Sequence, residues 1–443
     1  MTSDMARSTT ATAVSLDHCV SNHPFVPLRR RPVRLLWSAA VISDAGTWVQ
    51  LIVVGSLVAA TTGSAVQTGL VALATFMPQG IAAPIGGLLA DRFDRRRVFA
   101  VALLLQAVFT SVLAITLGAG VRQPGVLSAL ILLSSAAGSL GAPSYAAMLP
   151  DLVPPEELMA MVSLGVYSWN SGRMVGPLLG TGLALAVGPA WTVAFNAATF
   201  VVMAGAVWLV RQPFRGVAGD GTVGERLIGG WRVLRATPGC VHGVVLVVLL
   251  NLAIAPFMGL IPIYAKAEFG GGTGLAGVIS SAQGLGAIVG GVAITMLAAR
   301  LRRSLLLRGV VLLISTALAA YALAPGAAWV IGIAAVLGAS SSSLFITASA
   351  IVQRDAPDAG RGRVMSIMQA AMGVSYGVGL LTIGVIGDAT NLRVAFSVGA
   401  GAMLAGFGLM TARSRHWRQA VDGTGSALAV GTSLGAEATV AVA

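Results

Sequence analysis

The stretch Pro84 to Val98, PIGGLLADRFDRRRV, decides the fold of this chain. A glycine-rich apolar run ends at Asp91, a cluster of arginines follows, and a second uncharged run begins at once. The arginines of this turn are Arg92, Arg95, Arg96 and Arg97. Charged side chains are costly in hydrocarbon, so the pattern predicts a short charged turn between two membrane helices. Excess arginine indicates the cytoplasmic surface.

The composition agrees with a membrane protein. Only 10% of the 443 residues are charged and 56% are hydrophobic, whereas a globular protein has about a quarter of its residues charged. The net charge of +12 does not indicate a nucleic-acid partner, because the basic residues punctuate apolar runs instead of gathering on one surface. Of the 28 basic residues all but Lys266 are arginine, a compositional hint of a bacterial genome.

Twelve apolar segments are long enough to cross a bilayer, which takes about 20 residues. The expected spans are 35–60, 66–89, 98–120, 126–149, 159–187, 191–210, 241–265, 274–298, 305–324, 328–351, 364–387 and 394–412. Where no charge separates neighbouring spans, turn residues such as Gly188-Pro189 do. The tails and even-numbered connections hold 24 basic residues and the odd-numbered connections three, which predicts that both termini are cytoplasmic.

The expected domain organisation follows from these spans. We expect a disordered cytoplasmic tail over 1–32, a six-helix half over 33–211, a linker over 212–240, a second six-helix half over 241–412, and a disordered cytoplasmic tail over 413–443. The linker can form a short amphipathic helix with Trp231 and Leu234 toward lipid, with an unstructured connection as the alternative.

The charged turn also resembles a known family. Gly87, Asp91, Arg92, Arg95 and Arg96 match in spacing the signature between the second and third helices of the major facilitator superfamily. Asp94, where that family prefers Gly, resembles the drug:proton antiporter-3 branch of enterobactin and macrolide exporters. The resemblance covers about residues 30–412 and implies an all-α integral membrane protein with two pseudo-symmetric six-helix halves and a substrate site between them. It also implies that the turn is a conformational latch, whose acid is held against the start of the eleventh helix.

Two ionisable residues lie deep in the apolar segments, Asp44 in the first and Arg173 in the fifth. A charge within the membrane is a functional-site hypothesis by default. We predict that the two form one coupled polar site and are candidates for proton coupling, with Asp44 as the proton carrier. A static ion pair that locks the first half is the alternative.

The helix that carries Arg173 has small residues at regular spacing. Gly172, Gly176, Pro177 and Gly180 resemble the antiporter motif of the superfamily's fifth helix, although Thr181 departs from the pattern. Small residues allow a close helix neighbour and Pro bends the helix. Antiport is the interpretation that this motif favours, and helix packing without a mechanistic role is the alternative.

Other polar and aromatic residues within the spans are candidates for the lining of a substrate cavity. They are Trp48, Tyr145, Asn170, Asn251, Gln283, Gln369 and Tyr376. With few hydrogen-bonding groups, such a cavity favours hydrophobic or amphiphilic compounds over sugars.

The sequence contains no nucleotide-binding GxxxxGK[ST] and no His, Cys or Asp cluster with metal spacing. We therefore expect no cofactor, no metal and no enzymatic activity, and transport that draws on an ion gradient. The leading hypothesis is proton-coupled efflux of drugs, secondary metabolites or siderophores by a monomer in the bacterial inner membrane. A nutrient facilitator or importer is the alternative, and a membrane receptor a weaker one.

Overall fold

The computed structural model describes residues 25–210, 223–298, 300–357, 360–413 and 417–422, and every regular element in those ranges is a helix. Most of each predicted tail, 1–24 and 423–443, lies outside the described residues. The helices, in chain order, are η1 (Val26–Arg29), α2 (Arg31–Thr62), α3 (Ala65–Arg92), α4 (Arg95–Gly118), α5 (Pro124–Met148), η2 (Pro150–Leu152), η3 (Pro155–Glu157), α6 (Leu158–Leu209), α7 (Val223–Ala236), α8 (Pro238–Ala253), α9 (Pro256–Phe269), α10 (Thr273–Ala298), α11 (Arg303–Ala322), α12 (Ala327–Asp355), α13 (Arg361–Ala389), α14 (Leu392–Arg413) and α15 (Trp417–Asp422).

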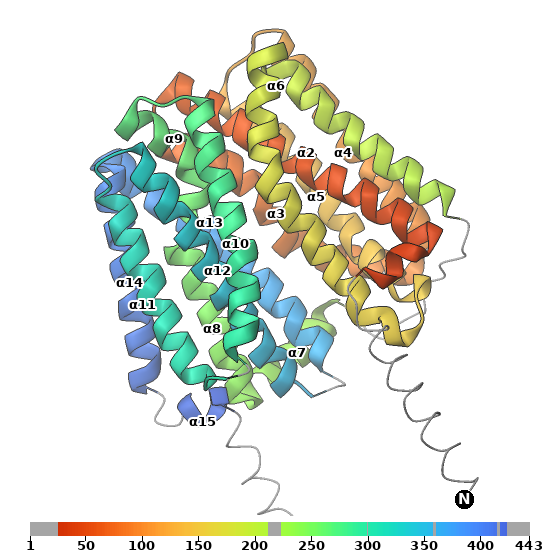
Figure 1. Ribbon diagram of the computed structural model, residues 1–443. Coiled ribbons are helices and arrows are strands. Elements are labelled where there is room, and N and C mark those ends of the chain that lie inside the picture. Colours follow the sequence, from red (N-terminus) through yellow and green to blue (C-terminus); the bar gives the residue numbers. More distant parts are fainter. Residues whose placement is uncertain (1–24, 211–222, 299, 358–359, 414–416, 423–443) are drawn as a thin grey trace, which may run out of the picture.

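The described residues contain eleven helical segments that are long and apolar enough to span a membrane, and one of these segments makes two crossings. Within α6, Gly188 has a φ of +83° and a ψ of 166°, and Pro189 begins the returning helix (Figure 1). A straight helix of 52 residues would be about 78 Å long, far more than one bilayer. The predicted break at Gly188-Pro189 and the predicted total of twelve crossings are confirmed.

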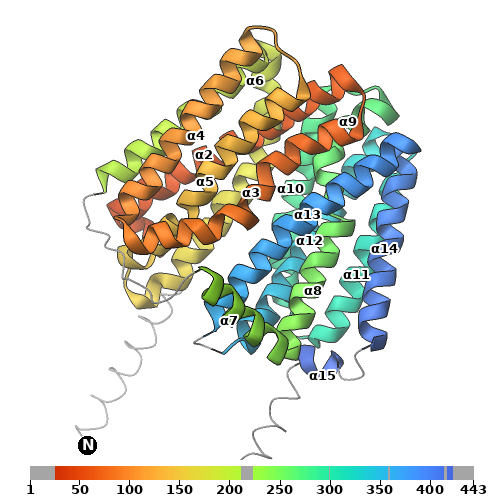
Figure 2. The ribbon, with the colours of Figure 1, turned by 180° about the vertical axis from the view of Figure 1, so that it is seen from behind.

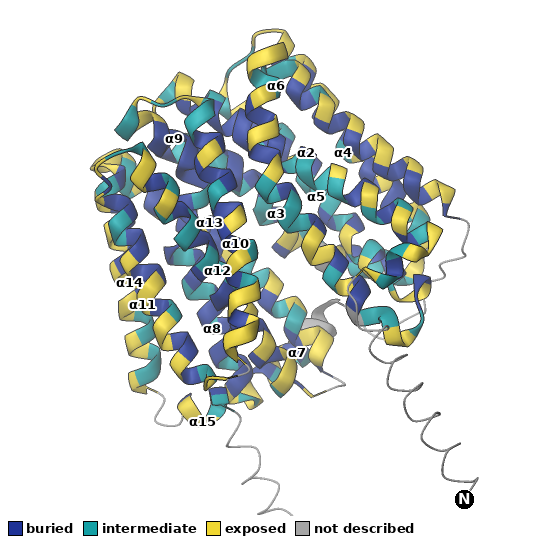
Figure 3. Ribbon diagram, viewed as in Figure 1, coloured by how far each residue is buried: buried dark blue, intermediate teal, exposed yellow. Residues whose placement is uncertain are grey.

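The outer surface of the bundle is apolar. Ile115, Leu185 and Trp191 are 70%, 78% and 72% exposed, and exposed positions run along the outer faces of α11, α14 and the second half of α6 (Figure 3). Exposed apolar surface on this scale would be unstable in water, so it contacts lipid. The protein is a multi-pass membrane protein.

The chain folds into two helical bundles, one formed by α2 to α6 and one by α8 to α14 (Figures 1 and 2). Two of the three hydrophobic clusters of buried residues lie within the first bundle. The third fills the second bundle and extends to Ile52 of α2 and Ala72 of α3. Among the described residues, the two bundles therefore share part of one hydrophobic core, alongside α9 (Figure 2).

The charged turn forms as the sequence predicts, with Phe93 and Asp94 connecting α3 to α4. Asp94 lies just before α4, and its carboxylate accepts a hydrogen bond from the backbone N–H of Arg97 at 3.0 Å. An acidic N-cap satisfies one of the free N–H groups at the helix start. The Asp at position 94 therefore has a local structural function.

The linker does contain a helix, α7, but one of its two predicted lipid-facing residues is buried. Trp231 is 47% exposed, whereas Leu234 is only 4% exposed. The reason lies one turn earlier, where a Cβ at Gly230 would come within 3.0 Å of Arg363 Cβ on α13. Residues four apart share a helix face, so the close approach of α13 at Gly230 turns Leu234 inward. The prediction for Leu234 is wrong.

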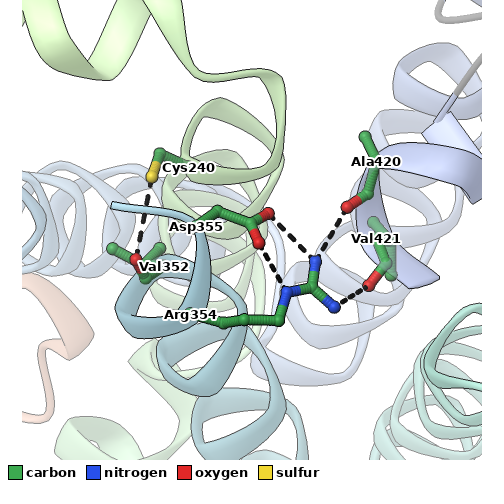
Figure 4. Close-up of polar contacts among 6 residues, drawn as sticks. All are labelled: Cys240, Val352, Arg354, Asp355, Ala420 and Val421. Carbon is green, nitrogen blue, oxygen red and sulfur yellow. Dashed lines mark hydrogen bonds and ion pairs between the residues drawn. The ribbon is translucent and has the colours of Figure 1, made fainter. Parts of the chain in front are cut away.

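The short α15 closes the same end of the second bundle. Arg354, near the end of α12, pairs with the Asp355 carboxylate and donates to the carbonyl oxygens of Ala420 and Val421 at 2.9 and 3.1 Å (Figure 4). Asp422 accepts from the N–H of Ser304 at 2.8 Å, at the start of α11. The helix α15 therefore connects the ends of α11 and α12.

Candidate functional site

The first half of α6 packs so closely against α2 that three of its glycines leave no space for a side chain. A Cβ at Gly172 would come within 2.8 Å of the Asp44 and Ala45 backbone, and one at Gly176 within 2.6 Å of Trp48 Cβ. One at Gly180 would come within 3.0 Å of the Val49 Cα. The three glycines of the predicted motif thus form a continuous contact with α2. This geometry explains the spacing by close packing, and it leaves the antiport role of the motif a prediction.

Asp44 lies in this contact. Its carboxylate accepts a hydrogen bond of 2.5 Å from the hydroxyl of Ser168, one turn before Gly172 on the same face of α6. Asp44 is therefore bonded to the hydroxyl of Ser168 within the first bundle, and a hydroxyl can pair with a carboxyl group in either protonation state.

Arg173 points in another direction. Its Nε donates to Gln283 Oε1 at 2.9 Å and its Nη2 contacts Met258 Sδ at 3.2 Å. Both partners belong to the second bundle, on α10 and α9. The guanidinium also lies over the ring of Trp48, 5.6 Å from its centroid.

The predicted pairing of Asp44 with Arg173 is therefore not present in this conformation. Successive residues of a helix are rotated by about 100°, so Gly172 faces α2 and its neighbour Arg173 faces the other bundle. The sequence located both ionisable residues, but their distance along the membrane said nothing about the direction of each side chain. Their part in proton coupling stays a prediction.

A small pocket of about 20 Å³, enough for about one water molecule in this conformation, lies between the two bundles beside Arg173. It is lined by residues of α2, α3, α6, α9 and α10, among them Trp48, Thr68, Pro177, Met258, Pro262 and Gln283. Trp48 and Gln283 are two of the predicted cavity residues. The lining is mostly apolar, and no acidic residue contributes to it.

Aromatic rings form one wall near this pocket. The ring of Trp48 lies 5.5 Å from that of Trp169 and 5.9 Å from that of Phe76, and Phe76 in turn lies 5.4 Å from Tyr376. Tyr376, a third predicted cavity residue, reaches the pocket edge. A Cβ on the lining residue Gly259 would be 3.2 Å from the Tyr376 hydroxyl oxygen.

The structure places the other predicted cavity residues elsewhere. Tyr145 stacks on Phe99 at 4.9 Å beside the core of the first bundle. Asn170 and Asn251 each donate to a carbonyl of their own helix, four residues earlier. Gln369 is exposed on α13. These four residues do not line the pocket, because a polar residue in an apolar span is as often bonded to its own backbone as to a ligand.

The pocket residues that α9 contributes were not among those predicted from the sequence. Met258, Gly259 and Pro262 line the pocket because the span of α8 and α9 is interrupted at Ile254 and resumes at Pro256. Proline removes a backbone donor and bends the chain, so the two prolines in this span were the available signal.

Two charged residues that join the bundles at one end of their interface were not predicted from the sequence either. Asp388, at the end of α13, accepts from the backbone N–H of Ala65 at 2.5 Å and of Val66 at 3.1 Å, at the start of α3. Lys266 of α9 donates to the carbonyl oxygens of Ala59 and Ala60 at 3.1 and 2.8 Å, in the last turn of α2. An acid at a helix N-terminus and a base at a C-terminus both complement the helix dipole. We call these contacts the clasp.

The predicted latch residues lie at the opposite end of the first bundle. Arg95 donates to the carbonyl of Ala147 at 3.0 Å and lies 3.5 Å from Asp151. Arg96 donates to the carbonyl of Trp208 and lies over its ring, 4.9 Å from the centroid. These contacts stay within the first bundle.

Gly87, another of the predicted latch residues, has open space beside it: a Cβ added there would meet nothing within 4 Å. Arg92 is exposed and Asp91 half-buried at the end of α3. The latch role of Asp91, with its carboxylate held against the start of α13, stays a prediction.

Comparison with known proteins identifies the family. Residues 22–427 match the family described as transmembrane secretion effector. The chain belongs to this family of the major facilitator superfamily. It is 25% identical over 387 residues to the multidrug efflux pump Tap of Mycolicibacterium fortuitum, covering 83% of this chain and 92% of that protein. It is 28% identical over 371 residues to the enterobactin exporter EntS of Escherichia coli, covering 81% of this chain and 86% of that protein.

Solved structures of the major facilitator superfamily share the fold. A bacterial homologue of the lysosomal transporter Spinster, in an inward-facing and unoccupied conformation, has a TM-score of 0.67 at 14% identity over 88% of this chain and 97% of the other. The D-xylose–proton symporter has a TM-score of 0.67 at 16% identity over 86% of this chain and 96% of the other. The predicted all-α fold and membership of the superfamily are confirmed, and the chain is a transporter.

Proposed function

We propose that this transporter exports small hydrophobic or amphiphilic compounds by alternating access, with protons as the driving ion. The observation that carries the proposal is the pocket between the two bundles, lined by Trp48 and Gln283 and closed at one end by the clasp. A site between two bundles that converge at one end can be opened to either side in turn. The relatives named as efflux pumps and exporters support the outward direction over nutrient import.

The orientation follows from charge. The arginine-rich turns at Arg95 and at Arg354 lie at the end opposite the clasp, and arginine-rich connections remain in the cytoplasm. We therefore assign the clasp to the external side and both termini to the cytoplasm. The conformation described here then faces inward, ready to take a compound from the cytoplasm.

Proton coupling is assigned to Asp44. Among the described residues it is the carboxylate placed within a membrane crossing at the depth of the pocket, one helical turn from Trp48. Its partner Ser168 belongs to α6, which also contacts α10 of the second bundle through Thr181. When the bundles rock, the surroundings of α6 change, and with them the access of water to Asp44. A proton taken up in one state can thus be released in the other.

The first prediction concerns this carboxylate. A drug-sensitive bacterial host that lacks its own efflux pumps should gain resistance and energy-dependent efflux from the wild type, and lose both on Asp44→Asn, because an amide cannot exchange a proton. The measurement is a growth screen against a compound panel, followed by efflux of the compounds that score. Protein levels in the membrane are compared throughout.

Glu156→Gln is the matched control. Glu156 is an exposed carboxylate outside the pocket, so its neutralisation should leave resistance unchanged. Uphill efflux by Asp44→Asn at the wild-type rate would show that the proton takes another route or that another ion drives export.

A further inference from the structure

Three buried side chains in or beside the pocket carry a polar group that can donate a hydrogen bond. Trp48, Gln283 and Tyr376 are 5%, 1% and 6% exposed. The Nε1 of Trp48, the Nε2 of Gln283 and the hydroxyl of Tyr376 have no hydrogen-bond partner within the described protein. Buried polar groups are rarely left unpaired, because the desolvation cost is not returned. Three such groups around one pocket therefore indicate a ligand that accepts hydrogen bonds.

The unpaired group of Gln283 is its NH₂, which can only donate. Its Oε1 already accepts from Arg173 Nε at 2.9 Å, which fixes the amide so that the NH₂ group is the unpaired one. The indole N–H of Trp48 can only donate. Arg173 itself has donors only, and it brings a positive charge to the pocket edge.

No acid balances that charge in the pocket. The lining contains no Asp or Glu. The acidic residues on neighbouring helices have partners elsewhere: Asp44 binds Ser168, Glu268 binds Arg393 at 2.5 Å, and Asp388 binds the start of α3. A cation would meet uncompensated repulsion from Arg173 here, whereas an anion would gain a partner.

The aromatic wall beside the pocket indicates a second feature of the ligand. Trp169, Trp48, Phe76 and Tyr376 form a chain of ring contacts beside the donors. Aromatic side chains bind planar apolar groups over a large area with defined geometry.

From these observations we propose that the pocket selects compounds in which an aromatic ring carries an anionic, hydrogen-bond-accepting group such as a sulfonate, carboxylate or phenolate. The proposal rests on the transport function above and specifies the chemical class of its substrate. The anionic group lies against Arg173, Gln283 and Trp48, and the ring lies along the aromatic wall.

The test uses three compounds with one ring system and different charges: naphthalene-1-sulfonate, naphthalene-1-sulfonamide and (1-naphthylmethyl)trimethylammonium. Their binding to the purified full-length protein is measured by isothermal titration calorimetry. The sulfonate should bind at least about tenfold more tightly than the ammonium compound, with the sulfonamide between them. Equal or tighter binding of the cation, or binding of none of the three, would overturn the proposal.

Variants of the pocket separate charge from shape. Arg173→Gln should reduce the preference for anion over cation to about twofold or less, and Arg173→Lys should keep it, because the charge is retained. Arg122→Gln, which removes an equal charge outside the pocket, should leave the preference unchanged. A preference that survives Arg173→Gln would contradict the proposal.

Trp48→Phe keeps an aromatic ring and removes the N–H donor. It therefore tests the proposed binding site even if the Arg173 variants do not fold. It should weaken the sulfonate and the sulfonamide about fivefold and leave the ammonium compound unaffected. Equal weakening of all three would contradict the donor role. Binding to purified protein does not depend on export, so a lack of anion preference alongside efflux in cells would overturn only the substrate class.

Discussion

At the scale of single residues, three glycines of α6 allow close packing against α2 because they have no side chain. A Cβ at Gly176 would lie 2.6 Å from Trp48 Cβ, whereas one at Gly182 on the same helix would meet nothing within 4 Å. We predict that Gly176→Ala destabilises the protein by about 1 to 3 kcal/mol through overpacking and displaces Trp48, while Gly182→Ala is neutral. Thermal unfolding of the two purified variants measures the difference. Equal melting temperatures of the Gly176→Ala and Gly182→Ala variants would show that α2 and α6 can move apart with little loss of stability.

The sequence predicted which residues matter at this scale better than it predicted their contacts. Asp44 and Arg173 stand out because charge is rare in apolar spans, and Trp48 and Gln283 do line the pocket. The pairing of Asp44 with Arg173 was inferred from depth along the helices alone, and it is not present in this conformation. The direction of each side chain is set by the 100° rotation between successive helix residues and by which helix packs against the glycines. That information appears only once α2 and α10 are placed on opposite sides of α6.

At the scale of helices, the clasp sets the balance between the two conformations. Asp388 joins α13 to the N-terminus of α3 across the two bundles. Asp388→Asn removes the charge from these bonds, a loss of about 1 to 2 kcal/mol, and should shift the equilibrium toward the outward-open state about five- to thirtyfold. Spin labels at Thr61 and Gly272, in a background without Cys19 and Cys240, would report longer distances by pulsed electron paramagnetic resonance.

Asp422→Asn is the matched control for that experiment. Asp422 also accepts from the start of a helix, at Ser304, but both residues belong to the second bundle and its end helix. Its replacement should leave the distance distribution unchanged. If Asp388→Asn also left it unchanged, the clasp would not stabilise the inward-facing state.

Helix boundaries were predictable where a single residue imposes them. Gly188 with its positive φ and the Asp94 cap are signals that the chain itself carries. The interruption between α8 and α9 and the burial of Leu234 were not, since both depend on which helix lies alongside. The same limit applies to the clasp, whose partners are more than 200 residues apart in sequence.

At the scale of the whole molecule, the charge of the substrate determines the electrical character of transport. Export of a singly charged anion in exchange for one proton moves two positive charges inward, which is worth about 4.6 kcal/mol at 100 mV. We predict that a potential negative inside proteoliposomes accelerates exit of naphthalene-1-sulfonate. The potential is set with potassium gradients and valinomycin. A rate that does not respond to the potential would indicate an electroneutral exchange, as expected for a cation.

The central claim is the exchange of substrate for protons through Asp44. The most direct measurement loads proteoliposomes with a compound whose export the cell assay has established, clamps the potential, imposes no pH gradient, and follows luminal pH with trapped pyranine. Substrate leaving the wild-type liposomes should acidify the lumen, and Asp44→Asn should abolish the acidification. Substrate exit without proton entry in the wild type, or unchanged proton entry in Asp44→Asn, would contradict the account.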